Sequence, residues 1–428
     1  MLVTFVLLLL GFLLVIGLPV AFAMAVSGAI GLYLYGGMPI LSGILGTTPL
    51  TTANSYEMIT IPMFVLMAEF VILSGIASDL FKAATVWVGR IRGGVAMATA
   101  IAGAGFAAIS GSSTAAAATL AATSLPEMMK QGYEPKLAGG VVAISGTLAM
   151  LIPPSVALIL YGILADVSIS KLLIGGVIPG LIVTLAIVLT VWILVLLWPD
   201  SALPGKPYPF REKFTSLKRV GPMLVLFIAI TGTIYSGIAT PTEAAGIGAF
   251  VAMLLALYEG KLTLSTLWIA LRNSAQTSCM ILFIMMGAHI FGYFITLTRV
   301  TNDLTAWVST LPLAPLTIMF LILLGYIILG FFMDQIAILI LTVPVVLPTV
   351  IALGFDPIWF GVIVVVTAEV GMVTPPLGMN VFVVARYTRR PIGELFRGVM
   401  PHVWAHLIVI ALLTLFPGLV LWLPSTMN

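Results

Sequence analysis

The chain alternates long apolar runs with short polar segments, and a pair of prolines interrupts two of the runs. The run Leu137–Leu164 is interrupted at Pro153–Pro154, and the run Ile358–Val384 is interrupted at Pro375–Pro376. Each run is long enough to cross a bilayer as a helix, but consecutive prolines remove amide donors and clash with the preceding turn. The freed carbonyl groups are tolerated at membrane depth only where they are buried in protein or line a wet cavity. The pattern therefore predicts two broken membrane helices.

The other apolar runs predict uninterrupted spans, because their lengths approach the roughly 20 residues that a helix needs to cross the hydrocarbon core. Two polar stretches, Gly36–Ser55 and Glu259–Asn273, are expected to be arms that lie along the membrane interface. The predicted spans are Leu2–Gly17, Val20–Tyr35, Met58–Ile76, Leu172–Trp198, Pro222–Tyr235, Ala244–Leu257, Ser278–Thr296 and Leu395–Leu423.

Two further segments predict helical hairpins that enter and leave the membrane on the same side. The first covers about residues 96–129 and has its tip at the polar sequence Ser110–Thr114. This length is short for two full spans of about 20 residues and a turn, so a hairpin fits better. The second covers about residues 314–353 and turns near Asp334.

The second half of the chain repeats the first. Chance similarity of apolar segments would not keep glycines and prolines in register along the chain. We therefore predict a first repeat (1–198), a linker (199–219) and a second repeat (220–428), with broken helices at about 137–165 and 357–387. Nine positions coincide at a constant offset of 222 residues: Pro19 and Pro241, Pro126 and Pro348, Gly132 and Gly354, Pro135 and Pro357, Gly139 and Gly361, Pro153 and Pro375, Pro154 and Pro376, Gly176 and Gly398, and Pro179 and Pro401.

Composition supports a protein of the lipid bilayer. The chain is 61% hydrophobic and 8% charged, with a mean hydropathy of +1.22. A soluble core does not require such values, so the fold class is an all-α polytopic membrane protein. The basic residues belong to polar connections between spans, which excludes a nucleic-acid partner.

The distribution of Lys and Arg predicts the orientation, because cytoplasmic loops carry an excess of these residues. With the linker in the cytoplasm, all of the 18 Lys and Arg residues except Lys171 and Arg299 face inward. This solution has about five spans in each repeat, and an odd number inverts the second repeat relative to the first. The first hairpin then enters from the cytoplasm and the second from outside, and both termini are periplasmic.

The first hairpin tip carries a cluster of hydroxyl groups from Ser110, Ser112, Ser113 and Thr114, with Gly111 among them. Hydroxyls and carbonyls of such a turn replace the water shell of a cation. The short side chains also allow a carboxylate to approach the amides at a helix end. The alternative is a seam of small residues that packs helices together.

Polar side chains inside the second half are further candidates. Asp334 is the single charge between Leu316 and Leu353, and a carboxylate within a membrane segment is costly and is by default a functional hypothesis. The alternative is a loop carboxylate at the outer surface. Asn380, near Thr374, is either a polar group of the site or a structural amide that bonds to another helix.

Other titratable residues have weaker functional signals. Glu243 follows Pro241 and is expected to be structural, whereas the role of Glu369 before the second break stays open. His402 and His406 are four residues apart, with no third ligand nearby and no His-Glu-x-x-His pattern, so we expect no metal site there. A phosphate-binding Gly-x-x-x-x-Gly-Lys-Ser/Thr motif does not occur in the sequence, so ATP-driven pumping by this polypeptide is not expected.

Taken together, five ordered motifs resemble the large membrane subunit of TRAP transporters, the tripartite ATP-independent periplasmic transporters of bacteria and archaea. The resemblance covers essentially the whole chain, with a departure at Thr367, where the family often has Asn. The motifs are Ser110-Gly-Ser-Ser-Thr114, Leu151-Ile-Pro-Pro-Ser155, Thr240-Pro-Thr-Glu-Ala-Ala245, Met333-Asp334 and Thr374-Pro-Pro-Leu-Gly-Met-Asn380.

The resemblance implies a transporter rather than an enzyme, located in the bacterial cytoplasmic (inner) membrane. It implies two partners, a small membrane subunit and a soluble periplasmic substrate-binding protein. It also implies sodium-driven uptake of organic acids by an elevator-type motion, with sodium as the coupling ion and no other cofactor.

Candidate binding residues follow from the same motifs. The carbonyl ends of broken helices suit sodium, and their amide ends suit an anionic substrate. The first sodium site resembles Ser110, Ser113 and Gly146 with the break at Pro153, and the second resembles Gly330, Gly371 and Thr374. The expected substrate residues are Ser112, Ser113, Asp334, Pro154, Pro376 and Asn380.

Three other readings remain for comparison. An ion or anion channel would share the broken helices and polar tips but needs no soluble partner. A proton-coupled carboxylate transporter would also work without a soluble partner. An intramembrane enzyme would need a nucleophile with a neighbouring base, and Ser112 has no nearby His in the predicted topology.

Overall fold

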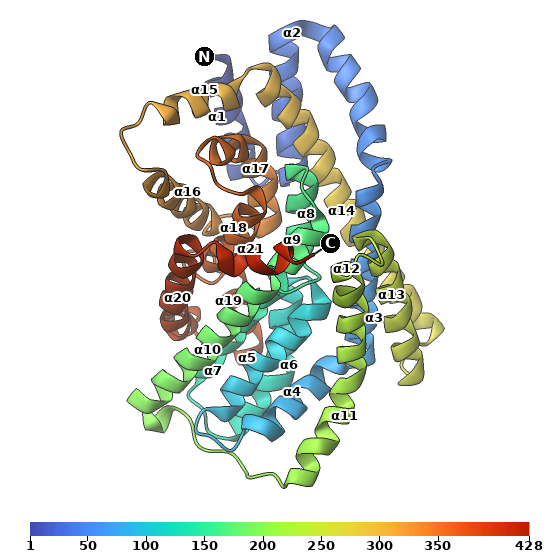
Figure 1. The fold of residues 1–428 in the computed structure, drawn as a ribbon, viewed down its shortest axis with the longest axis vertical. Helices are drawn as coiled ribbons and strands as arrows, with labels where there is room; N and C mark the ends of the chain where they lie inside the picture. The colour runs from blue at the N-terminus through green and yellow to red at the C-terminus, as the bar shows by residue number, and fades with distance from the viewer. Residues whose placement is uncertain (428) are drawn as a thin grey trace.

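The computed structural model describes residues 1–427, and these residues form helices joined by short connections (Figure 1). The helices of the first half are α1 (Leu2–Val15), α2 (Val20–Ala53), α3 (Thr60–Ser74), α4 (Ile76–Val88), α5 (Gly94–Ser110), α6 (Ser113–Lys130), α7 (Pro135–Thr147), α8 (Val156–Ala165), α9 (Ile169–Gly175) and α10 (Val177–Leu197). Short 3₁₀ segments lie at Tyr56–Ile59, Leu148–Met150 and Pro199–Ser201.

The second half begins with α11, and a π-helical turn at Ile228–Gly232 separates it from α12. Its helices are α11 (Phe210–Phe227), α12 (Thr233–Tyr235), α13 (Pro241–Tyr258), α14 (Leu264–Leu297), α15 (Val300–Ser309), α16 (Pro315–Gly330), α17 (Gln335–Ala352), α18 (Pro357–Met372), α19 (Met379–Thr388), α20 (Ile392–Leu415) and α21 (Gly418–Ser425).

Both predicted helix breaks are present in the fold. Helix α7 ends at Thr147, and α8 begins at Val156 after a cis peptide between Pro153 and Pro154. Helix α18 ends at Met372, and α19 begins at Met379 after a cis peptide between Pro375 and Pro376. Each break therefore separates the end of one helix from the start of another by a short irregular segment.

The two predicted hairpins are α5–α6 and α16–α17. Gly111, with a φ of 59°, makes the turn of the first hairpin between Ser110 and Ser113. In the second hairpin, the side chain of Asp334 caps the start of α17. Figure 1 shows α5 and α6 in the lower half of the molecule and α16 and α17 in the upper half.

The predicted arms differ from the observed helices. Residues 38–53 form the second part of α2, which bends at Gly37, where φ is 72° (Figure 1). The other predicted arm, Glu259–Asn273, is not separate from the span that follows it. It merges with that span into α14, which is 34 residues long. The prediction of two elements was wrong because residues 273–278 contain no glycine or proline to end the helix.

Helix α14 packs along α2 and α3 at very short range. A Cβ atom added to Gly28 of α2 would lie 2.8 Å from the Cα atom of Phe291 in α14. Small residues allow helix backbones in a membrane to approach closely, and the gain in van der Waals contact holds the helices together. These three helices therefore form a packed wall beside the interrupted elements.

The helices of the two halves follow one another in the same order. Helices α6 and α17 each have 18 residues and begin 222 residues apart, at Ser113 and Gln335. Helices α7 and α18 begin at Pro135 and Pro357, and α8 and α19 each have 10 residues. The inverted orientation of the two halves relative to a membrane stays a prediction.

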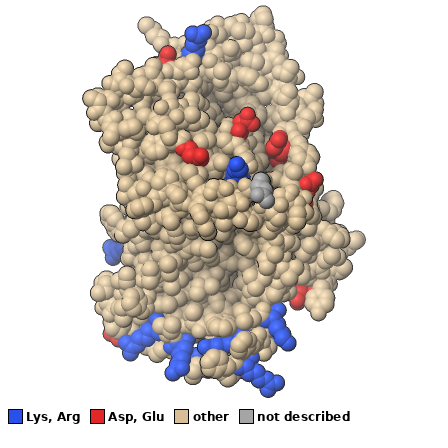
Figure 2. All heavy atoms as spheres, viewed as in Figure 1, with Lys and Arg blue, Asp and Glu red and all other residues tan. Residues whose placement is uncertain are grey.

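Eight helical segments of the described residues are long and apolar enough to cross a bilayer. Helix α1, a predicted span, has only 14 residues, about 21 Å at a rise of 1.5 Å per residue. Figure 2 shows Lys and Arg side chains gathered at the lower end of the molecule, where Figure 1 places the end of α10 and the start of α11. The fold is thus that of a multi-pass membrane protein with one basic end.

Candidate functional site

A cavity of about 390 Å³ lies where the two hairpin tips meet the two helix breaks. Both hairpin tips contribute lining residues, namely Ser110–Ser112 and Asp334–Ile336, and both breaks contribute methionines, including Met150 and Met372. Helices α3 and α14 form the opposite wall. We call this space the central cavity.

The first hairpin tip rests directly on the first helix break. Gly111 has the left-handed conformation, and a Cβ atom added to it would lie 3.3 Å from the carbonyl oxygen of Pro154. Only glycine combines this backbone conformation with so close an approach. The break and the tip are therefore held as one unit.

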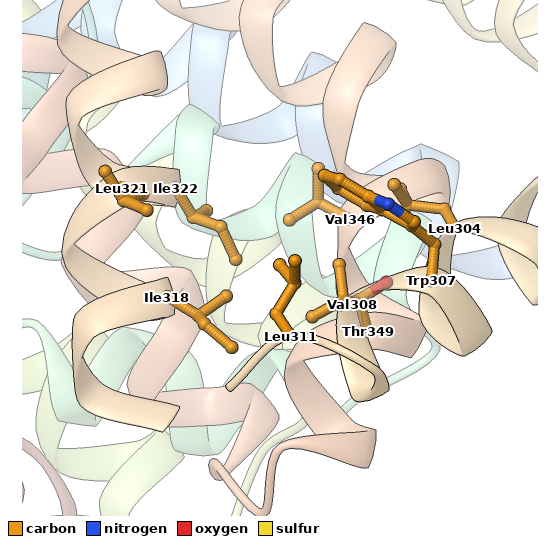
Figure 3. Close-up of a pocket in the computed structure, with 9 residues that line it drawn as sticks. All are labelled: Leu304, Trp307, Val308, Leu311, Ile318, Leu321, Ile322, Val346 and Thr349. Carbon is orange, nitrogen blue, oxygen red and sulfur yellow. The ribbon is translucent and has the colours of Figure 1, made fainter. Parts of the chain in front are cut away.

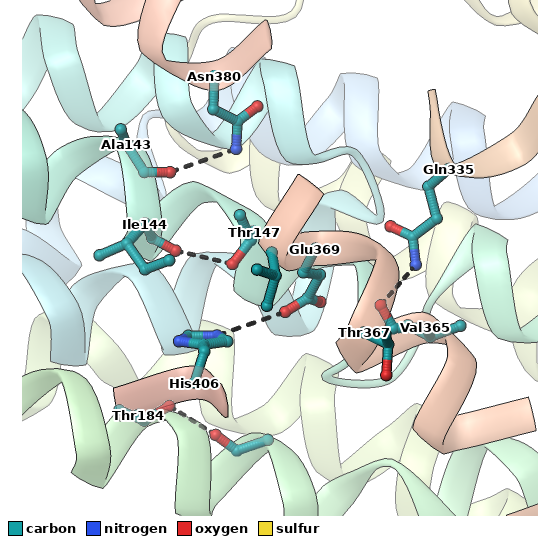
Figure 4. Close-up of polar contacts among 12 residues, drawn as sticks. Ala143, Ile144, Thr147, Thr184, Gln335, Val365, Thr367, Glu369, Asn380 and His406 are labelled. Atoms are coloured by element: carbon teal, nitrogen blue, oxygen red, sulfur yellow. Dashed lines mark hydrogen bonds and ion pairs between the residues drawn. The ribbon is translucent and has the colours of Figure 1, made fainter. Parts of the chain in front are cut away.

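A buried hydrogen-bond chain joins this unit to the second break. Ser113 Oγ donates to Asn380 Oδ1 at 2.9 Å, and Asn380 Nδ2 donates to the carbonyl oxygen of Ala143 at 3.2 Å. Figure 4 shows the second of these bonds, from α19 to α7. Both side chains are fully buried, and neither lines the central cavity, although both were expected to contact substrate.

The residues of the first expected sodium site lie close together. Ser110 Oγ and Ser145 Oγ are buried and have no hydrogen-bond partner among the described residues. Gly146 lies against α6 so closely that an added Cβ would be 2.7 Å from the Cβ atom of Ala117. Unpartnered buried hydroxyls are costly, and a bound cation or an ordered water would satisfy them.

The residues of the second expected sodium site are also adjacent. A Cβ atom added to Gly330 would lie 2.8 Å from the Cα atom of Gly371, so α16 and α18 touch backbone to backbone. Thr374 Oγ1 donates to the carbonyl oxygen of Val370 in the last turn of α18. The structure thus brings Gly330, Gly371 and Thr374 together at the second break.

The other expected substrate residues are divided between the cavity and its surroundings. Ser112 and Asp334 line the central cavity, and Asp334 Oδ1 accepts a hydrogen bond from the Ala337 amide at 2.6 Å. Pro154 is buried and Pro376 is exposed, and neither lines the cavity. Asp334 therefore has two roles available, as a helix cap and as a negative charge in the cavity.

Sequence reasoning missed two polar residues on the opposite wall, Glu69 of α3 and Thr277 of α14. Glu69 Oε2 accepts a hydrogen bond from Asn273 Nδ2 at 3.2 Å. The sequence does contain a signal for Glu69, because this residue is a single carboxylate within the apolar run Met58–Ile76. The argument that selected Asp334 selects Glu69 equally well.

Two other expectations concern carboxylates outside the cavity, one exposed and one buried. Glu243 forms a capping box with Thr240 at the start of α13, as the structural interpretation predicted. Glu369 is fully buried in α18, with its Oε2 atom 3.8 Å from His406 Nε2 of α20 (Figure 4). His402 lies one turn earlier in α20 and is also fully buried.

The environment of His402 gives a stability prediction. Neither of its ring nitrogens has a hydrogen-bond partner among the described residues, and a buried unpartnered polar group costs about 1–3 kcal/mol. We expect His402→Leu to leave the apparent melting temperature of the detergent-purified protein unchanged or to raise it. His289→Leu is the control and should lower it, because His289 Nδ1 is 2.8 Å from Thr52 Oγ1. A large loss of stability in His402→Leu would contradict this account.

One other cavity is almost entirely apolar. Figure 3 shows an apolar pocket of about 290 Å³ between α15, α16 and α17, where Trp307, Ile318 and Val346 are among the lining residues. Thr349 supplies its only polar side chain apart from the Trp307 indole. This pocket lacks groups for an ion or a small acid, whereas the central cavity has the hydroxyl and carboxylate groups of Ser110, Ser112 and Asp334 and is the candidate site.

Comparisons with known proteins agree with this arrangement. Residues 5–419 match the family model described as "Tripartite ATP-independent periplasmic transporter, DctM component". The chain is 34% identical over 404 residues to the C4-dicarboxylate TRAP transporter large permease protein DctM of Pseudomonas aeruginosa, covering 94% of each chain. It is 33% identical to the sialic acid TRAP transporter large permease protein SiaM of Vibrio cholerae, covering 87% of each.

A solved structure supports the fold independently. The YdaH transporter of Alcanivorax borkumensis superposes with a TM-score of 0.67 at 17% sequence identity, over 87% of this chain and 88% of that one. At this identity the likeness concerns the fold alone. The family match covers nearly the whole chain, including the paired breaks and both hairpin tips at the central cavity. The chain therefore belongs to the DctM family, the large membrane permease subunits of TRAP transporters.

Proposed function

We propose that this permease takes up an organic acid, with sodium as the coupling ion, from a periplasmic substrate-binding protein. The observation that carries the proposal is the central cavity, where four helix interruptions converge. Interrupted helices supply carbonyl groups for a cation and amide groups for an anion at the same depth. The small membrane subunit of the TRAP complex is the second proposed partner.

The chemical class of the substrate is supported by the relatives. Two of them are named as transporters of C4-dicarboxylates and of sialic acid, which are carboxylic acids. Another is named for isethionate, a sulfonate, so the relatives share organic anions as a class, with carboxylates in most of the names. A carboxylate in the central cavity would lie near the amide ends of α6 and α8, because Ser112 and Val156 line the cavity. The positive end of a helix favours such a group.

We place one sodium ion at Ser110, Ser113 and Gly146 and another at Gly330, Gly371 and Thr374. The unpartnered hydroxyl of Ser110 supports the first position. Both sites adjoin the cavity, so bound sodium would offset the charge of the acid. Coupling requires that sodium binds the substrate-competent state more tightly than the empty state.

The motion we propose is of the elevator type. The hairpins and broken helices form the moving block, because Gly111 rests on Pro154 and Ser113 bonds to Asn380. Helices α3 and α14 belong to the static wall on the other side of the central cavity. Movement of the block past this wall would carry the substrate across the membrane.

We also propose that both termini are periplasmic. The amino terminus lies at the end of the molecule opposite the basic end (Figures 1 and 2). At the other terminus, Thr426 Oγ1 is 3.0 Å from the hydroxyl of Tyr235. Tyr235 lies beyond the π-helical turn that follows α11, at the opposite end from the basic start of α11.

The test is uptake into proteoliposomes that hold the permease with its small membrane subunit, with the binding protein added outside. Radiolabelled succinate and sialic acid are the first probes, together with the acid that copurifies with the binding protein. We expect uptake that requires an inward sodium gradient and rises sigmoidally with sodium. Uptake without the binding protein, or uptake that does not saturate, would instead favour a channel.

Two variants locate the sodium sites. Ser113→Ala and Thr374→Ala should shift half-maximal uptake to about fivefold higher sodium, since each removes one hydroxyl contact of about 1 kcal/mol. Thr388→Ala is the control, because its hydroxyl bonds to carbonyl groups within α19 and Thr388 does not line the central cavity. A sodium dependence unchanged in both site variants would reject the proposed positions.

A further inference from the structure

A second cavity, of about 560 Å³, adjoins the central cavity on the side of α6 and α19. Thr114, Ala115 and Ala118 line it from α6, and Val383, Arg386 and Tyr387 line it from α19. Thr114 and Ala115 line the central cavity as well. The two cavities therefore meet at the first turn of α6, and we call the second one the α6–α19 groove.

The groove leads away from the hairpin tip toward the basic end of the chain. The hydrogen bond between Ser113 and Asn380 joins the first turns of α6 and α19. Later turns of both helices line the same groove, so the two helices run side by side in one direction. Helix α6 ends at Lys130, and α19 is followed by Arg389 and Arg390, which is the polarity of a cytoplasmic end.

The two cavities carry opposite charge. Glu69 and Asp334 line the central cavity, and the described lining residues include no Lys, Arg or His. Arg386 lines the groove with an exposed side chain and forms no salt bridge or hydrogen bond within residues 1–427. A free guanidinium beside the hydroxyls of Thr114 and Tyr387 matches the geometry and charge of a carboxylate.

We infer that the α6–α19 groove is the route by which the substrate anion leaves the central cavity toward the cytoplasm, and that Arg386 binds its carboxylate on the way. The inference rests on the proposed uptake of an organic acid. An anion that moves into the groove leaves the repulsion of Asp334 and Glu69 behind and is attracted by the positive charge of Arg386. Because Arg386 is exposed to solvent, the binding is weak enough for release, as passage through a site requires.

Thiol labelling tests the route without knowledge of the substrate. Cys279 is the single native cysteine, so Ala118→Cys is introduced together with Cys279→Ser in the complex with its partner subunits. Impermeant methanethiosulfonate reagents of opposite charge, one a sulfonate and one a trimethylammonium, are applied to inside-out and right-side-out vesicles. We expect labelling from the cytoplasmic side only, with the anionic reagent favoured over the cationic one.

Arg386 is then varied in the same background. Arg386→Gln should lower the ratio of anionic to cationic labelling rates about fivefold, as expected for the loss of one nearby charge in a partly wet groove. Arg386→Lys keeps the positive charge, so the ratio should stay close to that of the Arg386 protein. Succinate, but not chloride at equal ionic strength, should slow labelling when Arg386 is present and not in Arg386→Gln. Thr215→Cys on α11, exposed at the basic end, is the control, and its ratio should not change.

Labelling of Ala118→Cys from the periplasmic side, or a ratio that Arg386→Gln leaves unchanged, would overturn the inference. These outcomes are separate from failure of the proposed function. If the intact complex shows no sodium-driven uptake, the proposed function fails whatever the labelling shows. If uptake is normal but the anionic and cationic reagents label Ala118→Cys equally fast, only the assignment of the groove as the exit route is wrong.

Discussion

Asp334→Ala should reduce sodium-driven uptake at least about 100-fold, a loss of about 3 kcal/mol, because a carboxylate in a membrane cavity is held there for function. Asp334 lines the central cavity between the second hairpin and the second break. Its negative charge would favour sodium at the neighbouring proposed site, Gly330–Thr374, and would influence where the substrate anion lies. The measurement is the initial uptake rate in proteoliposomes with both partner subunits present.

Two comparisons separate the charge of Asp334 from its capping role. Asp334→Asn keeps a side chain that caps helices well, so it should match Asp334→Ala in lost uptake while it retains the wild-type melting temperature. Asp356→Asn is the matched control, since Asp356 caps α18 through the amides of Ile358 and Trp359 and lies outside the cavity. It should transport normally. Full uptake by Asp334→Ala in sodium-free buffer, driven by a proton gradient alone, would contradict the proposed sodium coupling.

Gly330→Ala and Gly325→Ala should have opposite effects on stability, although both residues lie in α16. An added methyl group at Gly330 would lie 2.8 Å from the Cα atom of Gly371, whereas nothing lies within 4 Å at Gly325. Alanine in a helix interior is more favourable than glycine by about 1 kcal/mol. At Gly330 this gain is outweighed by overpacking, which typically costs about 1–3 kcal/mol and requires α16 and α18 to separate.

The readouts are the apparent melting temperature and sodium-dependent uptake. Gly325→Ala should be as stable as wild type or more stable, with unchanged uptake. Gly330→Ala should lower the melting temperature and weaken sodium dependence, because the second proposed sodium site contains the Gly330–Gly371 contact. Equal behaviour of the two variants would show that this backbone contact has no role in either property.

The sequence alone determined the membrane class, the two helix breaks and the two hairpin tips. These features are local: prolines end helices wherever they lie, and a hydroxyl cluster or a carboxylate stands out within an apolar run. The same local signals place Asp334 at a turn, as the structure shows. They also predicted a structural role for Glu243, and the structure shows this residue in a capping box. The ordered motifs also predicted the family, and the family match over residues 5–419 confirms that prediction.

Local signals were less informative about helix length and the opposite wall. Residues 264–297 form one helix because no residue near position 275 stops it, and a polar stretch resembles an arm whether or not the helix continues through it. Glu69 lies in a run that reads as an ordinary span, and only the folded chain shows that it faces Asp334 across the same cavity.

Tertiary structure decided which residues meet. Ser113 and Asn380 are 267 residues apart and share a hydrogen bond, and Gly330 and Gly371 touch although each is an ordinary helix residue by itself. The groove at Arg386 exists only because α6 and α19 lie side by side. Such contacts depend on how helices from the two halves pack together, and this packing depends on side-chain shape across the whole interface rather than on any one segment.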